Sequence, residues 1–272
     1  MNAGLEAGRA QFARRSIFSD PKRLHHAICG LFYLEDIFDA ICRHLPLLAR
    51  ILWWRIDPRI SQRKLLFIHV ARSGGTSVCH ALYGGRIDHY SIRYYRTIHP
   101  RFCEQVSSFA LLRDPFERFK SAYFYVINRG AAMARLSDVF VAQTAHIVTV
   151  DDYLDFLESR DVSQLDFVMR PQSWFVCDLK TGEPLVKNLF RQGADDHRLK
   201  VFLRAHDAGN LLWLNRSRRQ ELELTPAQER RIERIYAHDF ALIEMLAQDR
   251  YAQARIDAMP SHVMLLRTAT SS

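Results

Sequence analysis

A short apolar run that leads directly into a glycine-rich turn is the feature that most constrains the fold of this chain. Residues 65–70 read Leu-Leu-Phe-Ile-His-Val, which is typical of a strand buried in a parallel sheet. The turn that follows contains Gly74 and Gly75 and opens a segment, residues 78–82, that is predicted to be helical. Glycines let backbone N–H groups close around an anion, and the N-terminus of a helix adds favourable potential. The sequence therefore predicts a phosphate-binding loop after a buried strand.

Side chains within this turn supply further groups that suit an anion. Arg72 carries a permanent positive charge, and Thr76 and Ser77 carry hydroxyls. The turn lacks the Walker pattern, because no glycine precedes Gly74 at the required spacing and no lysine follows Gly75. A tight strand-to-helix turn that binds no ligand is the alternative interpretation.

A second strand–turn–helix unit follows later in the chain. Residues 109–112, Phe-Ala-Leu-Leu, are predicted to form another buried strand. Asp114 can cap the next helix, and Pro115 can occupy its first position. Two such units predict an α/β fold, a P-loop-like three-layer α/β/α sandwich with a central parallel sheet, plus an N-terminal helical segment. The apolar residues of the second helix fall on one face: Phe116, Phe119, Tyr123 and Val126.

Arg113 ends the second strand, and Ser121 lies about two helical turns further on. If the Arg113 side chain leans along the helix, the two residues can hold one phosphate group. Arg118 and Lys120 add positive charge to the same helix. The alternative is a solvated helix with ordinary ion pairs.

The remaining segments divide the chain into three parts. Residues 1–60 are expected to form a basic tail and a helical segment interrupted by Pro46. Residues 61–260 are expected to form the α/β domain, and 261–272 a flexible C-terminal tail. Within the domain we expect a helix at 151–159, a loop at 170–172, a late strand at 201–203, and a long helix that starts with a capping box at Thr225–Gln228.

The net charge of +8 favours anionic partners: a nucleotide, an acidic glycan, a nucleic acid or a membrane surface. Arginine makes up 32 of the 38 basic residues, and its planar fork of donors binds phosphate and sulfate well. A genome rich in arginine codons explains the same bias.

The cysteines and the apolar segments bear on where the protein works. Five cysteines without a C-x-x-C pair predict reduced thiols rather than a disulfide framework or a zinc site. Residues 1–23 do not read as a signal peptide, and no uncharged apolar run is long enough to span a bilayer. A cytoplasmic protein is expected. Residues 45–56, which include Trp53 and Trp54, either dock on the domain or make peripheral contact with a membrane.

Taken together, the two strand–turn–helix units resemble the sulfotransferase superfamily. Residues 67–77 resemble its 5′-phosphosulfate loop, and residues 112–123 resemble its 3′-phosphate motif, in the same order and at a similar spacing. The resemblance covers roughly residues 64–247. Three later segments are similar to the carbohydrate-type branch, especially its bacterial members: 170–173, 214–217 and 236–240.

The resemblance implies a donor, 3′-phosphoadenosine 5′-phosphosulfate (PAPS), and no metal. It implies that Arg113 and Ser121 hold the 3′-phosphate and that Arg216 and Ser217 close over the nucleotide. Ala71-Arg72 replaces the usual Pro-Lys, so the contact of Arg72 with the bridging oxygen of the leaving phosphate differs from that of a lysine. The residues expected to hold the 5′-phosphosulfate are Arg72, Ser73, Gly74, Gly75, Thr76 and Ser77.

Sulfuryl transfer also needs a base for the acceptor hydroxyl, and histidine suits neutral pH. His89 is the first candidate, because bacterial members of the family often carry a histidine before a short helix at this place. His99 is the second candidate, while His80 falls within a predicted helix. Asp88, Glu104 and His69 stay open as alternatives.

The expected activity is PAPS-dependent O-sulfation of a carbohydrate or glycolipid, without nucleic-acid binding. Arg93, Arg96 and Arg101, with Tyr94 and Tyr95, form either an acidic-acceptor groove or a solvated helix face. Residues 171–172 and Trp174 either line the acceptor site or form a structural loop. The competing interpretations are an ATP-dependent kinase, a catalytically inactive nucleotide-binding member, and a basic nucleic-acid or membrane binder.

Overall fold

The structure is a computed structural model, and it describes residues 37–52, 56–131, 134–135, 138–208 and 221–248. Three parallel strands form its central sheet: β1 (Leu65–Ile68), β2 (Ser107–Leu112) and β5 (Asn188–Arg191), in the order β1-β2-β5. Phe67 pairs with Phe109, and Ala110 pairs with Leu189. β1 is wholly buried and β2 nearly so, as expected of strands covered on both faces. The α/β fold predicted from the sequence is confirmed.

Each strand leads from its carboxyl end towards a helix. β1 leads to α5 (Gly75–Tyr83), β2 to α8 (Pro115–Ile127), and β5 to α12 (Asp196–Arg204). Because the strands are parallel, the turns after β1 and β2 meet at the same edge of the sheet. Helix α4 (Pro58–Arg63) precedes β1, and α6 (Ile92–Ile98) and α7 (Pro100–Gln105) lead back to β2.

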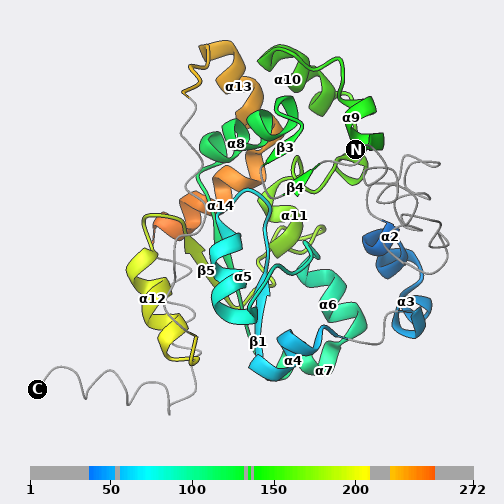
Figure 1. Cartoon of the computed structure of the whole chain (residues 1–272), viewed down its shortest axis with the longest axis vertical. Coiled ribbons are helices and arrows are strands. Elements are labelled where there is room, and N and C mark those ends of the chain that lie inside the picture. The colour runs from blue at the N-terminus through cyan, green and yellow to red at the C-terminus, as the bar shows by residue number, and fades with distance from the viewer. Residues whose placement is uncertain (1–36, 53–55, 132–133, 136–137, 209–220, 249–272) are drawn as a thin grey trace, which may run out of the picture.

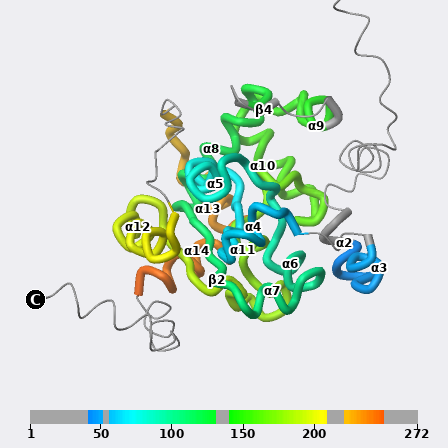
Figure 2. The backbone as a smooth tube through the Cα atoms, turned by 60° about the horizontal axis from the view of Figure 1, so that its bottom comes forward, coloured from blue at the N-terminus to red at the C-terminus, as the bar shows by residue number. Residues whose placement is uncertain are grey.

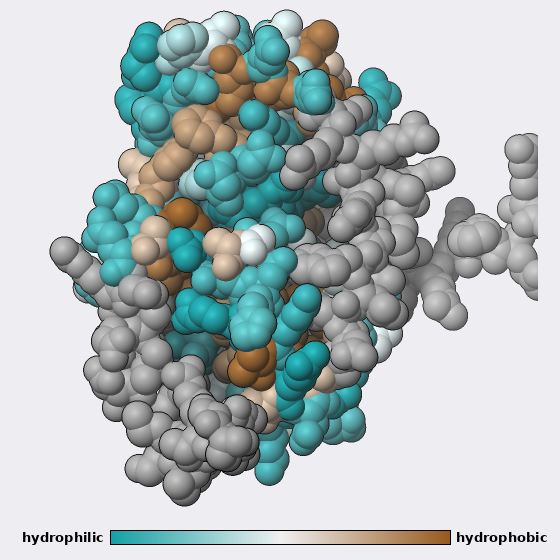
Figure 3. Space-filling view, turned by 90° about the vertical axis from the view of Figure 1, so that its left-hand side faces the viewer, coloured by the Kyte–Doolittle hydropathy of each residue, from teal (hydrophilic) through white to brown (hydrophobic). Residues whose placement is uncertain are grey.

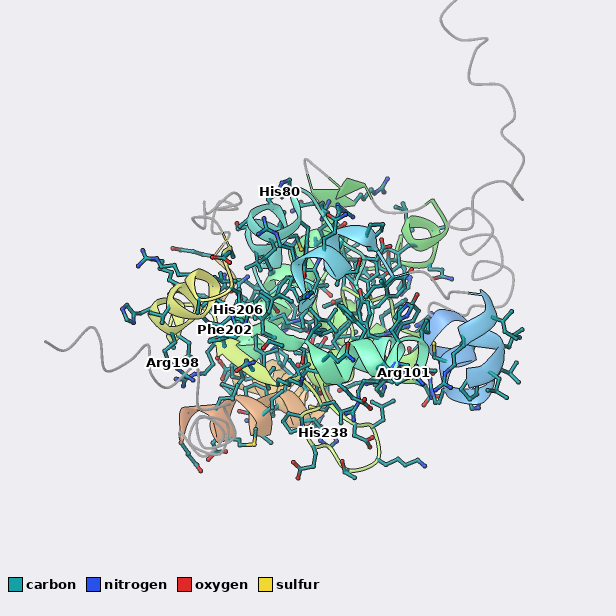
Figure 4. All side chains as sticks on the ribbon, turned by 90° about the horizontal axis from the view of Figure 1, so that it is seen from below. His80, Arg101, Arg198, Phe202, His206 and His238 are labelled. Carbon is teal, nitrogen blue, oxygen red and sulfur yellow. The ribbon has the colours of Figure 1, made fainter. Side chains whose placement is uncertain are left out.

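The strand expected at residues 201–203 is wrong, because these residues lie within α12. Leu199, Phe202 and Leu203 are buried while Val201 is exposed, which is a helical period rather than an alternating one. Phe202 and His206 lie together one turn apart (Figure 4), with ring centroids 4.4 Å apart. The third strand is β5, which has only four residues, two of them half-buried, and carries a weak sequence signal.

A second core lies beyond the carboxyl edge of the sheet, where α8, α10 (Val150–Glu158) and α13 (Pro226–Ile235) gather (Figure 1). Arg231 joins α13 to α10 through ion pairs with three carboxylates of that helix.

The capping box at Thr225 is confirmed. The helix that it starts ends at Ile235, and α14 (Ala237–Ala247) follows, so the long helix expected there is two helices. The smaller elements are β3 (Gly130–Ala131), β4 (Ala134–Arg135), α9 (Asp138–Gln143), a 3₁₀ turn (Val162–Gln164) and α11 (Gln172–Val176).

The N-terminal helices α2 (Ile37–His44) and α3 (Pro46–Leu52) lie on the opposite side of the molecule from α12 (Figures 1 and 2). The break falls at Leu45, and Pro46 begins α3, in line with the predicted interruption at Pro46. Helix α3 docks on α6: Ala49 is fully buried, and Arg50 Nε donates to the Thr97 carbonyl at 2.7 Å. Leu47 and Ile51 nevertheless remain 72% and 71% exposed.

The surface on the α12 side differs from the α3 surface. The described residues visible there are mostly hydrophilic, interrupted by small hydrophobic areas (Figure 3). None of the helices in the described part of the chain has the length and apolar content needed to cross a bilayer. The cysteines within the described residues are buried and reduced: Cys42, Cys79, Cys103 and Cys177.

Candidate active site

The glycine-rich turn after β1 depends on both of its glycines. Gly74 has a φ of 80°, a left-handed conformation that side chains disfavour, and it occupies the N-cap of α5. Gly75 lies against the strand: a Cβ there would stand 2.5 Å from His69 Cδ2 and 3.0 Å from Phe67. The loop therefore packs its backbone directly on β1, and the N–H groups at the start of a nine-residue helix lie beside it.

Arg72 connects this loop with the second unit. Its Nε and Nη2 atoms donate to Ser121 Oγ at 3.0 and 2.8 Å, and its guanidinium lies 4.8 Å from the centre of the Tyr125 ring. Arg72 itself has a φ of 64°, an uncommon conformation for a residue with a side chain. The two segments singled out in the sequence, 49 residues apart at this contact, thus meet through their polar side chains.

Arg113 lies at the end of β2, but its side chain pairs with Glu117 at 3.3 Å on the first turn of α8. Lys120 pairs with the same carboxylate at 3.5 Å. Asp114 caps α8 by accepting from the Glu117 N–H, as predicted. The structure therefore puts Arg72, rather than Arg113, directly against Ser121.

Arg118 is buried, with a role that sequence reasoning missed. Its Nε donates to the Ala71 carbonyl at 3.0 Å and its Nη2 to the Val168 carbonyl at 3.3 Å. Arg118 thereby ties the start of the glycine-rich loop to the backbone at Val168. Burial lowers the pKa of Arg72, and the positive charges of Arg113 and Arg118 lower it further. Three neighbouring guanidinium groups make this edge of the sheet favourable for an anion.

Gln172 joins the two units from the opposite side. Its Oε1 accepts from Ser73 Oγ at 3.0 Å and from the Arg113 N–H at 2.8 Å, while its Nε2 donates to the Arg113 carbonyl at 2.8 Å. The residue is fully buried. Of the two alternatives for residue 172, acceptor-site lining or a structural loop, these contacts favour the structural one, because the two loops engage the whole amide.

Asp239, on α14, holds Gln172 in turn. This buried carboxylate accepts from the Gln172 N–H at 2.7 Å and from both the N–H and the hydroxyl of Ser173. The two later segments that resemble the carbohydrate-type branch, 170–173 and 236–240, therefore meet here. Segment 214–217, with Arg216 and Ser217, lies outside the described residues.

His89 is half-buried. It contacts His69, and this contact places it next to the glycine-rich loop. Its Nδ1 is 2.7 Å from the His69 carbonyl oxygen, so the ring carries its proton on Nδ1 and leaves Nε2 as an acceptor. Its ring packs on those of His69 and Phe167, with centroids 4.0 and 4.6 Å away. Burial lowers the pKa of His89 to about 4, and the charges of Arg86 and Arg118 contribute. His89 is therefore neutral at physiological pH.

The other histidines lie elsewhere. His69 is buried at the end of β1 and its Nδ1 is 3.2 Å from the Ile87 carbonyl. His80 lies at the periphery of α5 (Figure 4). His99 joins α6 to α7 and lines a pocket with Tyr94 and Tyr95, and burial lowers its pKa.

The arginine and tyrosine cluster of α6 is mostly structural. Tyr94 and Tyr95 are buried. Arg93 donates to the carbonyls of Trp174 and Cys177, so it fastens α6 to α11 instead of lining an open groove. In the described residues, no three His, Cys, Asp or Glu side chains cluster closely enough to hold a metal ion.

The candidate site thus combines three features. The glycine-rich loop lies at the N-terminus of α5, Ser121 on α8 accepts hydrogen bonds from Arg72, and the neutral His89 lies nearby. The chain matches the sequence profile of the sulfotransferase family over residues 61–244, which include every part of this site. No curated protein and no solved structure shows significant similarity to the chain. Because the match spans more than half of the chain and contains both strand–turn–helix units, the protein belongs to the sulfotransferase family.

Proposed function

We propose that this protein transfers a sulfuryl group from PAPS to a hydroxyl of a carbohydrate or glycolipid. The observation that carries the proposal is the contact of Arg72 with Ser121, because it joins the loop that suits a 5′-phosphosulfate to the helix that suits a 3′-phosphate. A donor with phosphates at both ends needs both segments. An ATP-dependent kinase would need only the first, with a Walker lysine that this chain lacks.

The residues present fit such a donor. The glycine-rich loop opens α5 at Gly74, and the backbone N–H groups at the N-terminus of this helix suit a phosphate. The hydroxyl of Thr76 and the backbone of Ser73 and Ser77 add donors for the 5′-end. Arg113 and Ser121 would hold the 3′-phosphate, with Arg113 released from Glu117. When bound, PAPS supplies the activated sulfuryl group and a stable leaving group, adenosine 3′,5′-bisphosphate.

The protein's own groups then carry the remaining chemistry. Arg72 stabilises negative charge that develops on the leaving phosphate. His89 would accept the proton of the acceptor hydroxyl at Nε2, as the acceptor oxygen bonds to sulfur and the sulfur–oxygen bond to the leaving phosphate breaks. A negatively charged neighbour favours the protonated form of a histidine, so a bound donor would raise the pKa of His89 from about 4 and make it a stronger base.

Calorimetric binding of 3′,5′-ADP, 5′-AMP and ATP to the wild type and to Arg113→Ala tests the donor. We expect 3′,5′-ADP to bind selectively and Arg113→Ala to lose that preference. Tighter binding of ATP would favour the kinase. Binding of 3′,5′-ADP without transfer of label from PAPS to any of a broad panel of glycans and glycolipids would favour an inactive member.

We also propose that α3 makes peripheral contact with a membrane, where a glycolipid acceptor would lie. Four apolar side chains of this region are exposed: Leu45, Leu47, Leu48 and Ile51. Arg43 and Arg50 flank them, which suits anionic lipids. Co-sedimentation with vesicles containing anionic lipid should fall at least fivefold in the double variant Leu47→Glu/Ile51→Glu. Equal sedimentation of the variant and the wild type would contradict the contact.

A further inference from the structure

A pocket of about 440 Å³ lies behind the segment that carries His89. The open pocket is lined by residues of α4, α6 and the segment 87–90, and its volume is within the range of about 300–1,000 Å³ that small-molecule sites occupy. None of the residues assigned above to PAPS lines it. The side chains that give it its chemistry are Asp57, Asp88, Tyr90, Tyr94, Tyr95 and His99.

One wall of the pocket is aromatic. The rings of Tyr90 and Tyr94 stack with centroids 4.1 Å apart and an interplanar angle of 14°. Tyr95 meets Tyr94 edge to face at 5.3 Å. Aromatic rings offer large apolar faces with hydroxyls at their edges, a combination that suits a ligand with both C–H faces and hydroxyl groups.

The polar residues include two carboxylates. Asp57 pairs with Arg59 at 2.6 Å, and the charge of Asp88 also acts on Arg59. Carboxylate oxygens accept hydrogen bonds from hydroxyls, but they repel an anion. Arg59 pairs with Asp57 and so offsets one of the two negative charges, which leaves a lining that disfavours an acidic ring and offers acceptors to the hydroxyls of a neutral one.

The pocket and the candidate base share one segment of backbone. Within residues 87–90, His89 is the residue that does not line the pocket, and its ring packs instead on His69 and Phe167. Hydrogen-bond contacts of Ile87 O and His89 Nδ1 with His69 hold this segment at the end of β1. The backbone of residues 87–90 therefore separates a ligand in the pocket from the side chain of His89, the candidate base.

We infer that this pocket binds a neutral sugar ring and serves as a second subsite for a glycan acceptor, apart from the sugar that carries the reacting hydroxyl. The assignment as an acceptor subsite rests on the proposed sulfotransferase function, whereas sugar binding in the pocket does not. Tyr90 provides a stacking face and Asp88 accepts from ring hydroxyls.

Saturation-transfer NMR and calorimetry with neutral methyl glycosides and disaccharides test the inference, with glucuronate and glucosamine as acidic and cationic comparisons. We expect Tyr90→Ala to weaken binding of the neutral ligands at least tenfold and Asp88→Asn at least fivefold. Glu104→Gln, which makes the same charge change on exposed α7 outside the pocket, should bind like the wild type. All three variants should keep the wild-type affinity for 3′,5′-ADP within twofold, which verifies their fold.

Failure to bind any neutral ligand, equal binding by Tyr90→Ala and the wild type, or tighter binding of glucuronate or glucosamine would overturn the inference. Sugar binding in a protein that does not bind 3′,5′-ADP would contradict the donor assignment but support the saccharide pocket. The two proposals can therefore fail separately.

Discussion

The side-chain amide of Gln172 pairs with both backbone groups of Arg113: Oε1 accepts from the N–H and Nε2 donates to the carbonyl, each at 2.8 Å. The same Oε1 accepts from Ser73, so one buried side chain sets the distance between the glycine-rich loop and the end of β2. A donor with phosphates at its two ends would need that distance held constant.

Replacing Gln172 with alanine should therefore destabilise the protein and weaken donor binding together. The change removes the Gln172 partner of the Arg113 N–H and carbonyl in a partly buried place, and an unsatisfied buried group costs about 1–3 kcal/mol. We expect the free energy of unfolding in urea to fall by about 2–5 kcal/mol. Gln248→Ala, at an exposed position on the end of α14, should change it by less than about 0.5 kcal/mol. Equal effects of the two changes would contradict the role of Gln172.

Asp239→Asn tests the carboxylate that holds Gln172 and Ser173 in place. The carboxylate accepts from two N–H groups and one hydroxyl, and an amide offers one acceptor oxygen and an NH₂ group that faces those donors. Hydrogen bonds to charged groups are worth about 1.5–3 kcal/mol, so we expect a loss of about 2–4 kcal/mol in thermal or urea unfolding. Asp239→Ala should lose more, because it removes every acceptor. A neutral result for Asp239→Asn would mean that the charge contributes nothing to holding α11.

Gly75→Ala should disturb the loop through crowding. Its new Cβ would stand 2.5 Å from His69, so the loop or the strand must shift, at a cost of about 1–3 kcal/mol. Affinity for 3′,5′-ADP should fall at least tenfold. Gly85→Ala is the matched control, because its Cβ would meet only the end of Arg59 at 3.4 Å, and its stability should change by less than about 0.5 kcal/mol. Wild-type affinity in Gly75→Ala would show that the close packing on β1 is not required.

The lowered pKa of His89 predicts acid sensitivity. In the unfolded chain this histidine takes up a proton near pH 6.5, whereas in the folded protein it does so only near pH 4. Between these values the unfolded state binds more protons, so stability is full above about pH 6.5 and falls as the pH drops towards 4. Urea unfolding at pH 7.5, 6 and 5 should show a smaller decline for His89→Asn than for the wild type. Identical slopes would contradict the assigned shift.

The same variant separates catalysis from donor binding. His89→Asn keeps a donor for the His69 carbonyl but loses the Nε2 acceptor, so kcat should fall about 100- to 10,000-fold once an acceptor is known. The affinity for 3′,5′-ADP should stay within twofold of the wild type. His99→Asn, at the α6–α7 junction, is the comparison variant, and a larger loss there would make His99 the base.

Local sequence rules account for much of the fold. The apolar run at Leu65–Ile68 and the Asp114–Pro115 helix start both rest on interactions within a few residues, and both appear as predicted. The segment at 201–203 was misassigned because three consecutive apolar residues fit a buried strand or a buried helix equally well. β5 was missed because its burial depends on pairing with β2, which no local pattern reveals.

At the candidate site, residue order alone is enough to predict the loop with its two glycines, the residues of both strand–turn–helix units, and the family that these identify. Those features depend on backbone conformation and residue order, which are local properties. The folded structure is needed to show that Arg72 contacts Ser121, that Arg118 supports the loop, and that Gln172 and Asp239 join segments far apart in the chain. The physical reason is that buried polar groups must find hydrogen-bond partners, and which partners are within reach is set by the packing of distant elements.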